Sequence, residues 1–249
     1  MLKTRPNAKP QTVSVNLKTT FTNKMNADEF KKLSTKFLAP RLREKGWKGS
    51  GFNFYRTTEN NIIQILGIQG SWHGGLVCCE TAIHFDFIPD LAGKTDPSKV
   101  SYASCLVRQR LSPKGEGDYH WTFRDHEEDN IKSLNQIFEA LDKFGEKFYQ
   151  DFNNFPSPFD RIKPKDFLTS NRVVLLDKYY VYSEFNFIWL LKEINLKINR
   201  LEIAKEFSEI GIGKASTYYN KLIDEAKSKK QKELTKVLLD NLTNQLKIE

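Results

Sequence analysis

The sequence predicts an α+β fold, in which an antiparallel sheet is flanked by an N-terminal helix and a long Phe-rich helix and is followed by a helical C-terminal half. Three observations indicate this fold. Apolar side chains recur every three or four residues in 26–46 and 127–152, which is the spacing of one helix face. Between these segments, β-rich runs are joined by short turns without an intervening helix, which favours antiparallel pairing. Helical patterns return after residue 185.

The N-terminal helix has clear signals at both ends. Asn26 is a favourable N-cap, and Glu29 stands at the third helical position, as in a capping box. Pro40 is expected to kink or restart the helix, and Gly46 to end it. The apolar stripe between these signals consists of Phe30, Leu33, Phe37, Leu38 and Leu42.

Five segments predict strands, namely 52–54, 62–68, 76–88, 102–111 and 119–123. The second of them is rich in isoleucine, which is typical of a central strand. Acidic residues at 127–129 favour the start of the long helix that follows. Trp121, Phe138, Leu141 and Phe148 are expected to be buried where this helix covers the sheet.

The segment 153–158 contains two prolines and ends the long helix. It therefore divides an α+β domain, 25–155, from a helical region, 156–249. Residues 173–182 suit a strand or a helix equally well. Helices are expected at 185–194, 201–210, 215–227 and 232–246, with 211–213 as the turn of a helical hairpin. The stretch 201–223 is superficially similar to a helix-turn-helix, but its turn is about three residues too long, which favours a plain hairpin.

Charge is distributed unevenly over the chain, whose net charge is +8. Residues 1–50 carry 12 Lys and Arg against 3 Asp and Glu, whereas residues 51–160 carry 10 against 16. Residues 161–249 carry 17 against 12. Residues 1–24 form a basic extension in which Val13, Val15 and Leu17 alternate with polar residues, a strand pattern. The basic segments suit an anionic partner or a solvated surface.

Composition favours a cytoplasmic protein. The cysteine count is odd and low, with Cys78, Cys79 and Cys105, which argues against a disulfide framework and for a reducing compartment. No apolar run approaches the roughly 20 residues that span a bilayer, so no membrane partner is expected. The first residues also lack the apolar stretch of a signal peptide.

The candidate binding residues are Arg108, Arg110, Trp121 and His120. Arg108 and Arg110 are two residues apart in a predicted strand, so their side chains share one face. The two guanidiniums could hold a phosphate or a partner's carboxylates, or they could form cross-strand ion pairs with the acidic middle region. Trp121 and His120 would line a pocket near them, with core packing as the alternative for Trp121.

No motif predicts a metal, a cofactor or a reaction. His84 and Asp86 share a predicted strand face with Cys78, and His73 is nearby in the sequence, but their spacing matches no standard zinc pattern. Phosphate-loop, dinucleotide and nucleophile-elbow patterns are not found in the sequence. A catalytic triad built from distant residues leaves no local pattern, so an enzyme with an unrecognised site stays an open alternative.

A set of features in residues 25–152 carries a family resemblance. A Gly46-Trp47 pair ends the first helix, the second strand ends in Gln69, and Arg108-x-Arg110-Leu111 precedes a polar turn and Trp121. In these features the segment resembles domain-of-unknown-function family 4304, a mainly bacterial family that often has paired tryptophans where this chain has His120-Trp121. The resemblance implies an α+β fold and a role in bacterial conflict or immunity gene clusters. It supplies no catalytic residues.

These observations lead to a ranked set of functions. The first is a non-enzymatic interaction protein, an immunity or defence-associated factor of a bacterial conflict system, with a protein partner. The alternative is a nucleic-acid-associated protein that uses the basic N-terminal segment and the C-terminal hairpin. The third is an enzyme. The sequence leaves the oligomeric state open.

Overall fold

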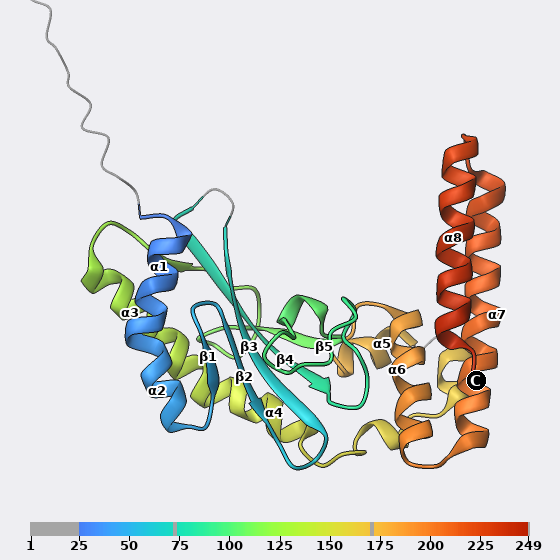
Figure 1. Cartoon of the computed structure of the whole chain (residues 1–249), viewed down its shortest axis with the longest axis horizontal. Coiled ribbons are helices and arrows are strands. Elements are labelled where there is room, and N and C mark those ends of the chain that lie inside the picture. Colours follow the sequence, from blue (N-terminus) through green and yellow to red (C-terminus); the bar gives the residue numbers. More distant parts are fainter. Residues whose placement is uncertain (1–24, 72–73, 170–171, 249) are drawn as a thin grey trace, which may run out of the picture.

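The computed structural model describes residues 25–71, 74–169 and 172–248. It confirms the predicted α+β fold, with the sheet and its helices at one end of an elongated molecule and a helical region at the other (Figure 1). The strand pattern predicted in residues 1–24 lies outside the described residues. No helix in the described ranges is both long enough and apolar enough to span a bilayer.

The N-terminal helix has three consecutive parts, which are α1 (Ala27–Leu33), the π-helical turn η1 (Ser34–Leu38) and α2 (Ala39–Glu44). The predicted capping box is present, because the Glu29 amide donates to the Asn26 side chain and the Asn26 amide donates to Glu29. Pro40 lies in the first turn of α2, directly after the π-helical turn, where the predicted kink or restart of the helix falls. Gly46 follows the helix with φ +80°, a conformation that favours glycine.

Six antiparallel strands form the sheet in the order β1-β2-β3-β4-β5, and β6 also pairs with β4. Their bounds are β1 (Lys48–Ser50), β2 (Asn53–Thr57), β3 (Ile62–Gly70), β4 (Leu76–Phe85), β5 (Val107–Leu111) and β6 (Trp121–Thr122). The strand predicted from residue 102 was too long. Tyr102–Ser104 forms a 3₁₀ turn, η2, because the Ser101 hydroxyl caps the Ala103 amide, and the strand starts only at Val107.

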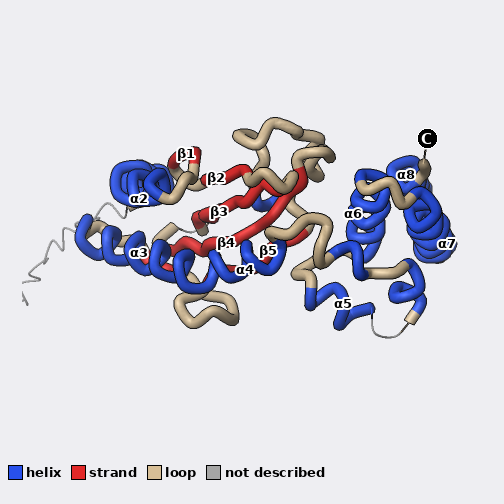
Figure 2. The backbone as a smooth tube through the Cα atoms, turned by 90° about the horizontal axis from the view of Figure 1, so that it is seen from below, coloured by secondary structure: helices blue, strands red, loops and turns tan. Residues whose placement is uncertain are grey.

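The long helix consists of α3 (Glu127–Ala140), the π-helical turn η3 (Leu141–Gly145) and α4 (Glu146–Phe152). It packs with the N-terminal helix on one face of the sheet, and Figure 2 shows α2, α3 and α4 beside the strands. Trp121, Leu141 and Phe148 are buried in this core, as predicted. Phe138 is only half-buried, because its ring lies at the edge under the Arg41 guanidinium, 3.8 Å from the ring centre.

Among the described residues, no long helix covers the opposite face of the sheet. Val100 and Cys105, from the loop between β4 and β5, cover Ile63, Ile65 and Ala82 there as a small second core. The rest of this face holds polar side chains from β3, β4 and β5. We call this part the open face.

The C-terminal region contains η4 (Phe159–Arg161), η5 (Pro164–Leu168), α5 (Arg172–Lys178), α6 (Glu184–Lys197), α7 (Leu201–Glu225) and α8 (Lys229–Leu246). The ambiguous stretch 173–182 is helical up to Lys178, and Val181 then forms a β-bridge with Val107. The core continues between the two regions, since the Phe159 ring lies 5.5 Å from Phe152 and 6.4 Å from Phe187.

The hairpin turn predicted at 211–213 was wrong. α7 runs straight through these residues, and the chain reverses only at 226–228 to form the long α7–α8 pair in Figure 1. Gly211 is a packing residue, because a Cβ there would lie 2.9 Å from side-chain atoms of both Ile188 and Leu246. Its missing side chain lets α6 and α8 approach α7 closely.

Candidate interaction face on the sheet

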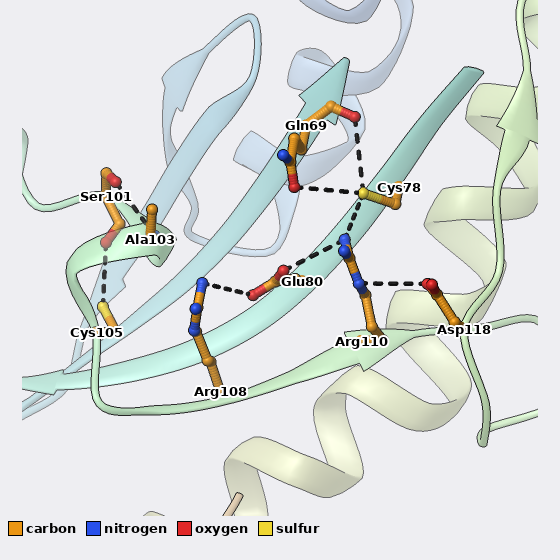
Figure 3. Close-up of polar contacts among 9 residues, drawn as sticks. All are labelled: Gln69, Cys78, Glu80, Ser101, Ala103, Cys105, Arg108, Arg110 and Asp118. Carbon is orange, nitrogen blue, oxygen red and sulfur yellow. Dashed lines mark hydrogen bonds and ion pairs between the residues drawn. The ribbon is translucent and has the colours of Figure 1, made fainter. Parts of the chain in front are cut away.

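The register between the strands determines which side chains lie next to each other on the open face. Glu80 on β4 is directly opposite Arg110 on β5, and Ala82 is opposite Arg108. Cys78, two residues before Glu80, is opposite Gln69 on β3. Because side chains alternate between faces, all five polar residues point to the same side of the sheet, as Figure 3 shows.

Glu80 connects the two arginines. Its Oε2 lies 3.1 Å from Arg108 Nη1, and its Oε1 lies 3.3 Å from Arg110 Nη1 (Figure 3). Arg110 Nε is also 3.3 Å from Asp118 Oδ1. The Glu80 side chain is only 10% exposed, whereas Arg108 and Arg110 are 27% and 31% exposed. The acid is therefore the buried centre of the network, and the guanidiniums form its surface.

The Cys78 thiol belongs to the same network. An Arg110 N–H donates to Cys78 Sγ, which itself lies 3.6 Å from Gln69 Oε1. Burial raises the pKa of Cys78, and the charge of Arg110 only partly opposes that rise. Burial also raises the pKa of the Cys79 and Cys105 thiols. A protonated thiol is a poor nucleophile, so this arrangement suits a structural cysteine better than a catalytic one.

Two tyrosines frame the arginines. The Tyr102 ring lies against Gly67, where no side chain stands in its way. Tyr182 places its ring 5.5 Å from the Arg108 guanidinium and is itself 74% exposed. Tyr182 is held there because the Arg108 amide donates to the Tyr180 carbonyl and Val181 bridges to Val107.

The four predicted site residues separate into two groups. The structure brings Arg108 and Arg110 together through Glu80. Trp121 is instead fully buried on the helix-covered face, since it pairs with Val77, whose side chain points away from that of Cys78. His120 is exposed beside it. Sequence reasoning missed Glu80 and Tyr182, although an acid within the apolar run 76–83 was a signal for Glu80.

The His84 side chain contacts the backbone. His84 is buried, and its Nε2 donates to the Ile88 carbonyl at 2.9 Å. Burial lowers the pKa of His84, so the ring is neutral at pH 7. Within the part of the chain that the structure describes, no three His, Cys, Asp or Glu side chains are placed to share a metal ion. His73 lies outside that part.

Residues 38–151 match the family model described as domain of unknown function (DUF4304). This part of the chain is similar to the DUF4304 family, and we call residues 38–151 the DUF4304 domain. Searches among curated proteins and among solved structures found no match. The DUF4304 domain supplies Gln69, Cys78, Glu80 and both arginines of the open face, whereas Tyr182 comes from the region that follows it.

Positive and negative side chains balance on the open face. Two guanidiniums are matched by the carboxylates of Glu80 and Asp118, so the DUF4304 domain presents no net positive charge to a phosphate here. The guanidiniums keep N–H groups at the surface, next to an exposed aromatic ring. Such a surface can donate hydrogen bonds and pack against a flat, partly apolar partner.

Proposed function

We propose that this protein is a non-enzymatic interaction module that binds a protein partner through the open face. The observation that carries the proposal is the stacking of the exposed Tyr182 ring on the Arg108 guanidinium, above a carboxylate that is already satisfied. Tyrosine and arginine are enriched at protein interfaces and supply many of their strongest contacts. The internal ion pairs hold both arginines in place, which lowers the entropy lost on binding.

The family resemblance implies a role in bacterial conflict. It therefore supports a more specific proposal, that the protein is an immunity or defence-associated factor in the cytoplasm. The three free, buried cysteines suit a reducing compartment. The gene neighbourhood tests this role. An adjacent toxin or nuclease gene supports it, and neighbours restricted to housekeeping metabolism argue against it.

Tyr182→Ala is expected to abolish capture of a protein partner from a lysate of the source organism, because it removes the exposed ring while leaving the Glu80 network intact. The melting temperature should stay within error, since Tyr182 is mostly solvated. Capture is measured with and without nuclease, beside a melting curve for each variant. Leu234→Ala, which removes an exposed apolar side chain on α8, is the matched control and should capture normally. Equal capture by the Tyr182 variant would contradict the proposal.

A second candidate is a nucleic-acid-associated protein, and one observation favours it. The exposed tip of the α7–α8 pair carries five lysines, 227, 229, 230, 232 and 236, against the single carboxylate of Glu233 between residues 226 and 236. Lysines spread along a projecting helix suit contacts with phosphates, which need no sequence-specific pocket. The basic segment 1–24 would add further positive charge to the chain.

If the lysine-rich tip binds phosphates, affinity for a generic duplex should fall steeply with salt. The triple variant Lys229→Gln, Lys230→Gln, Lys232→Gln should then reduce the slope of log affinity against log salt by roughly 3, about one for each lost phosphate contact. Deletion of residues 1–24 should flatten the dependence further. Fluorescence anisotropy with a labelled duplex and single strand measures both effects. No binding of either at low salt would exclude this candidate.

A further inference from the structure

A groove lies between α5, α6 and α7 in the helical region, and it shares no residue with the open face. The groove is open to solvent, and its volume of about 420 Å³ is within the range of roughly 300–1,000 Å³ that small-molecule sites occupy. Residues at its rim and walls come from the start of α5, the start of α6 and the middle of α7. Those that bear on its chemistry are Arg172, Glu184, Phe185, Lys214, Tyr218 and Lys221.

One wall of the groove is aromatic. Tyr218 is 52% exposed, although its ring is braced by two others. The ring centre lies 5.9 Å from that of Phe185 and 5.2 Å from that of Tyr219. Tyr219 in turn lies 6.1 Å from Phe185. A large ring held in place yet open to solvent is a ready surface for stacking a flat ligand.

The rest of the groove is basic. Three cations line it against one carboxylate, Glu184, whose Oε1 lies 2.9 Å from Lys214 Nζ. Lys214 also donates to the Phe167 carbonyl, so it is fixed in the wall. Arg172 is 3.9 Å from Glu184 and half-exposed, and Lys221 is 74% exposed with a loose contact to Glu225 at 3.8 Å. Arg172 and Lys221 can therefore turn to an anion at little cost.

The floor of the groove is open at Gly213. A Cβ built on this residue would have no atom within 4 Å. The glycine is in the middle of α7, where alanine would favour the helix by about 1 kcal/mol. Neither packing nor backbone conformation accounts for a glycine here, and a side chain at this position would extend into the groove.

We propose that this groove binds a nucleotide, with the base stacked on Tyr218 and the phosphate held by Arg172 and Lys221. The inference is independent of the protein-binding face and of the lysine-rich tip. The same chemistry is offered by a free mononucleotide and by a single strand of nucleic acid, since both present a flat base and a phosphate.

The test is a binding titration of the full chain with adenosine triphosphate, with inorganic phosphate and with a short labelled single strand. Tyr218→Ala should weaken binding about tenfold or more, whereas Tyr218→Phe keeps the ring and should bind as the native chain does. Lys221→Gln should weaken binding and reduce its salt dependence. Gly213→Leu should fill the groove and block binding with no loss in melting temperature.

Lys147→Gln is the matched control, because this lysine on α4 is 72% exposed, contacts Asp151 four residues on as Lys221 contacts Glu225, and lies outside both the groove and the lysine-rich tip. It should leave binding unchanged. Tighter binding of the triphosphate than of the labelled strand indicates a free nucleotide as ligand, and tighter binding of the strand indicates a single-stranded nucleic acid. The proposal is overturned if neither the triphosphate nor the labelled strand binds at low salt, if Tyr218→Ala and Gly213→Leu bind normally, or if Lys147→Gln weakens binding as much as Lys221→Gln does.

Discussion

Phe148→Ala should lower the free energy of unfolding by about 3–5 kcal/mol. The ring is buried in the core on α4, where its centre lies 5.4 Å from Tyr149, 5.2 Å from Phe152 and 5.5 Å from Tyr180. These neighbours belong to the long helix and to the segment that follows α5. Truncation would thus leave a cavity between the DUF4304 domain and the helical region, and rigid rings around it can collapse only partly.

Chemical denaturation of Phe148→Ala beside the native chain measures this effect. Phe138→Ala on the same helix is the matched control, because its half-buried ring lies at the edge under Arg41 and should cost clearly less. A Phe148 variant that melts within error of the native chain would remove this ring from the core. It would also show that the two regions are not joined through α4.

Gly67→Ala should cost about 1–3 kcal/mol, although alanine is ordinarily the better residue in a strand. A Cβ at this position would lie 1.9 Å from Cδ1 of the Tyr102 ring and 2.7 Å from its Cβ. The ring cannot keep its place, so the loop that carries it must move away from β3. That loop also covers the small second core, which would gain exposure.

A double-mutant cycle separates this clash from other effects. Tyr102→Ala alone loses the buried part of the ring, but Gly67→Ala should add no further cost once the ring is gone. The measurement compares the loss in free energy of unfolding of the double variant with the sum of the losses of the two single variants. Additive losses would mean that the two residues do not conflict, and that Gly67 is needed for another reason.

Local signals in the sequence predicted much of the fold correctly. Asn26 with Glu29, Pro40 and Gly46 each act on the few residues around them, so the N-terminal helix could be located without knowledge of the rest. The strand alternation likewise placed Arg108 and Arg110 on one face. Gly211 shows where such reasoning fails, because a glycine suits a turn and a close helix crossing equally well, and only the neighbours Ile188 and Leu246 distinguish the two.

The sequence by itself determined the α+β class, the order of first helix, strands and long helix within 25–152, and the shared face of the two arginines, because these depend on spacing along one segment. The tertiary structure decided which groups meet on that face. Glu80 reaches both arginines only through the β4–β5 register, and Tyr182 reaches Arg108 only because α5 returns the chain to the edge of β5. It also buried Trp121 on the other side of the sheet. Contacts between residues so far apart in the chain depend on the packing of whole elements, which no local pattern records.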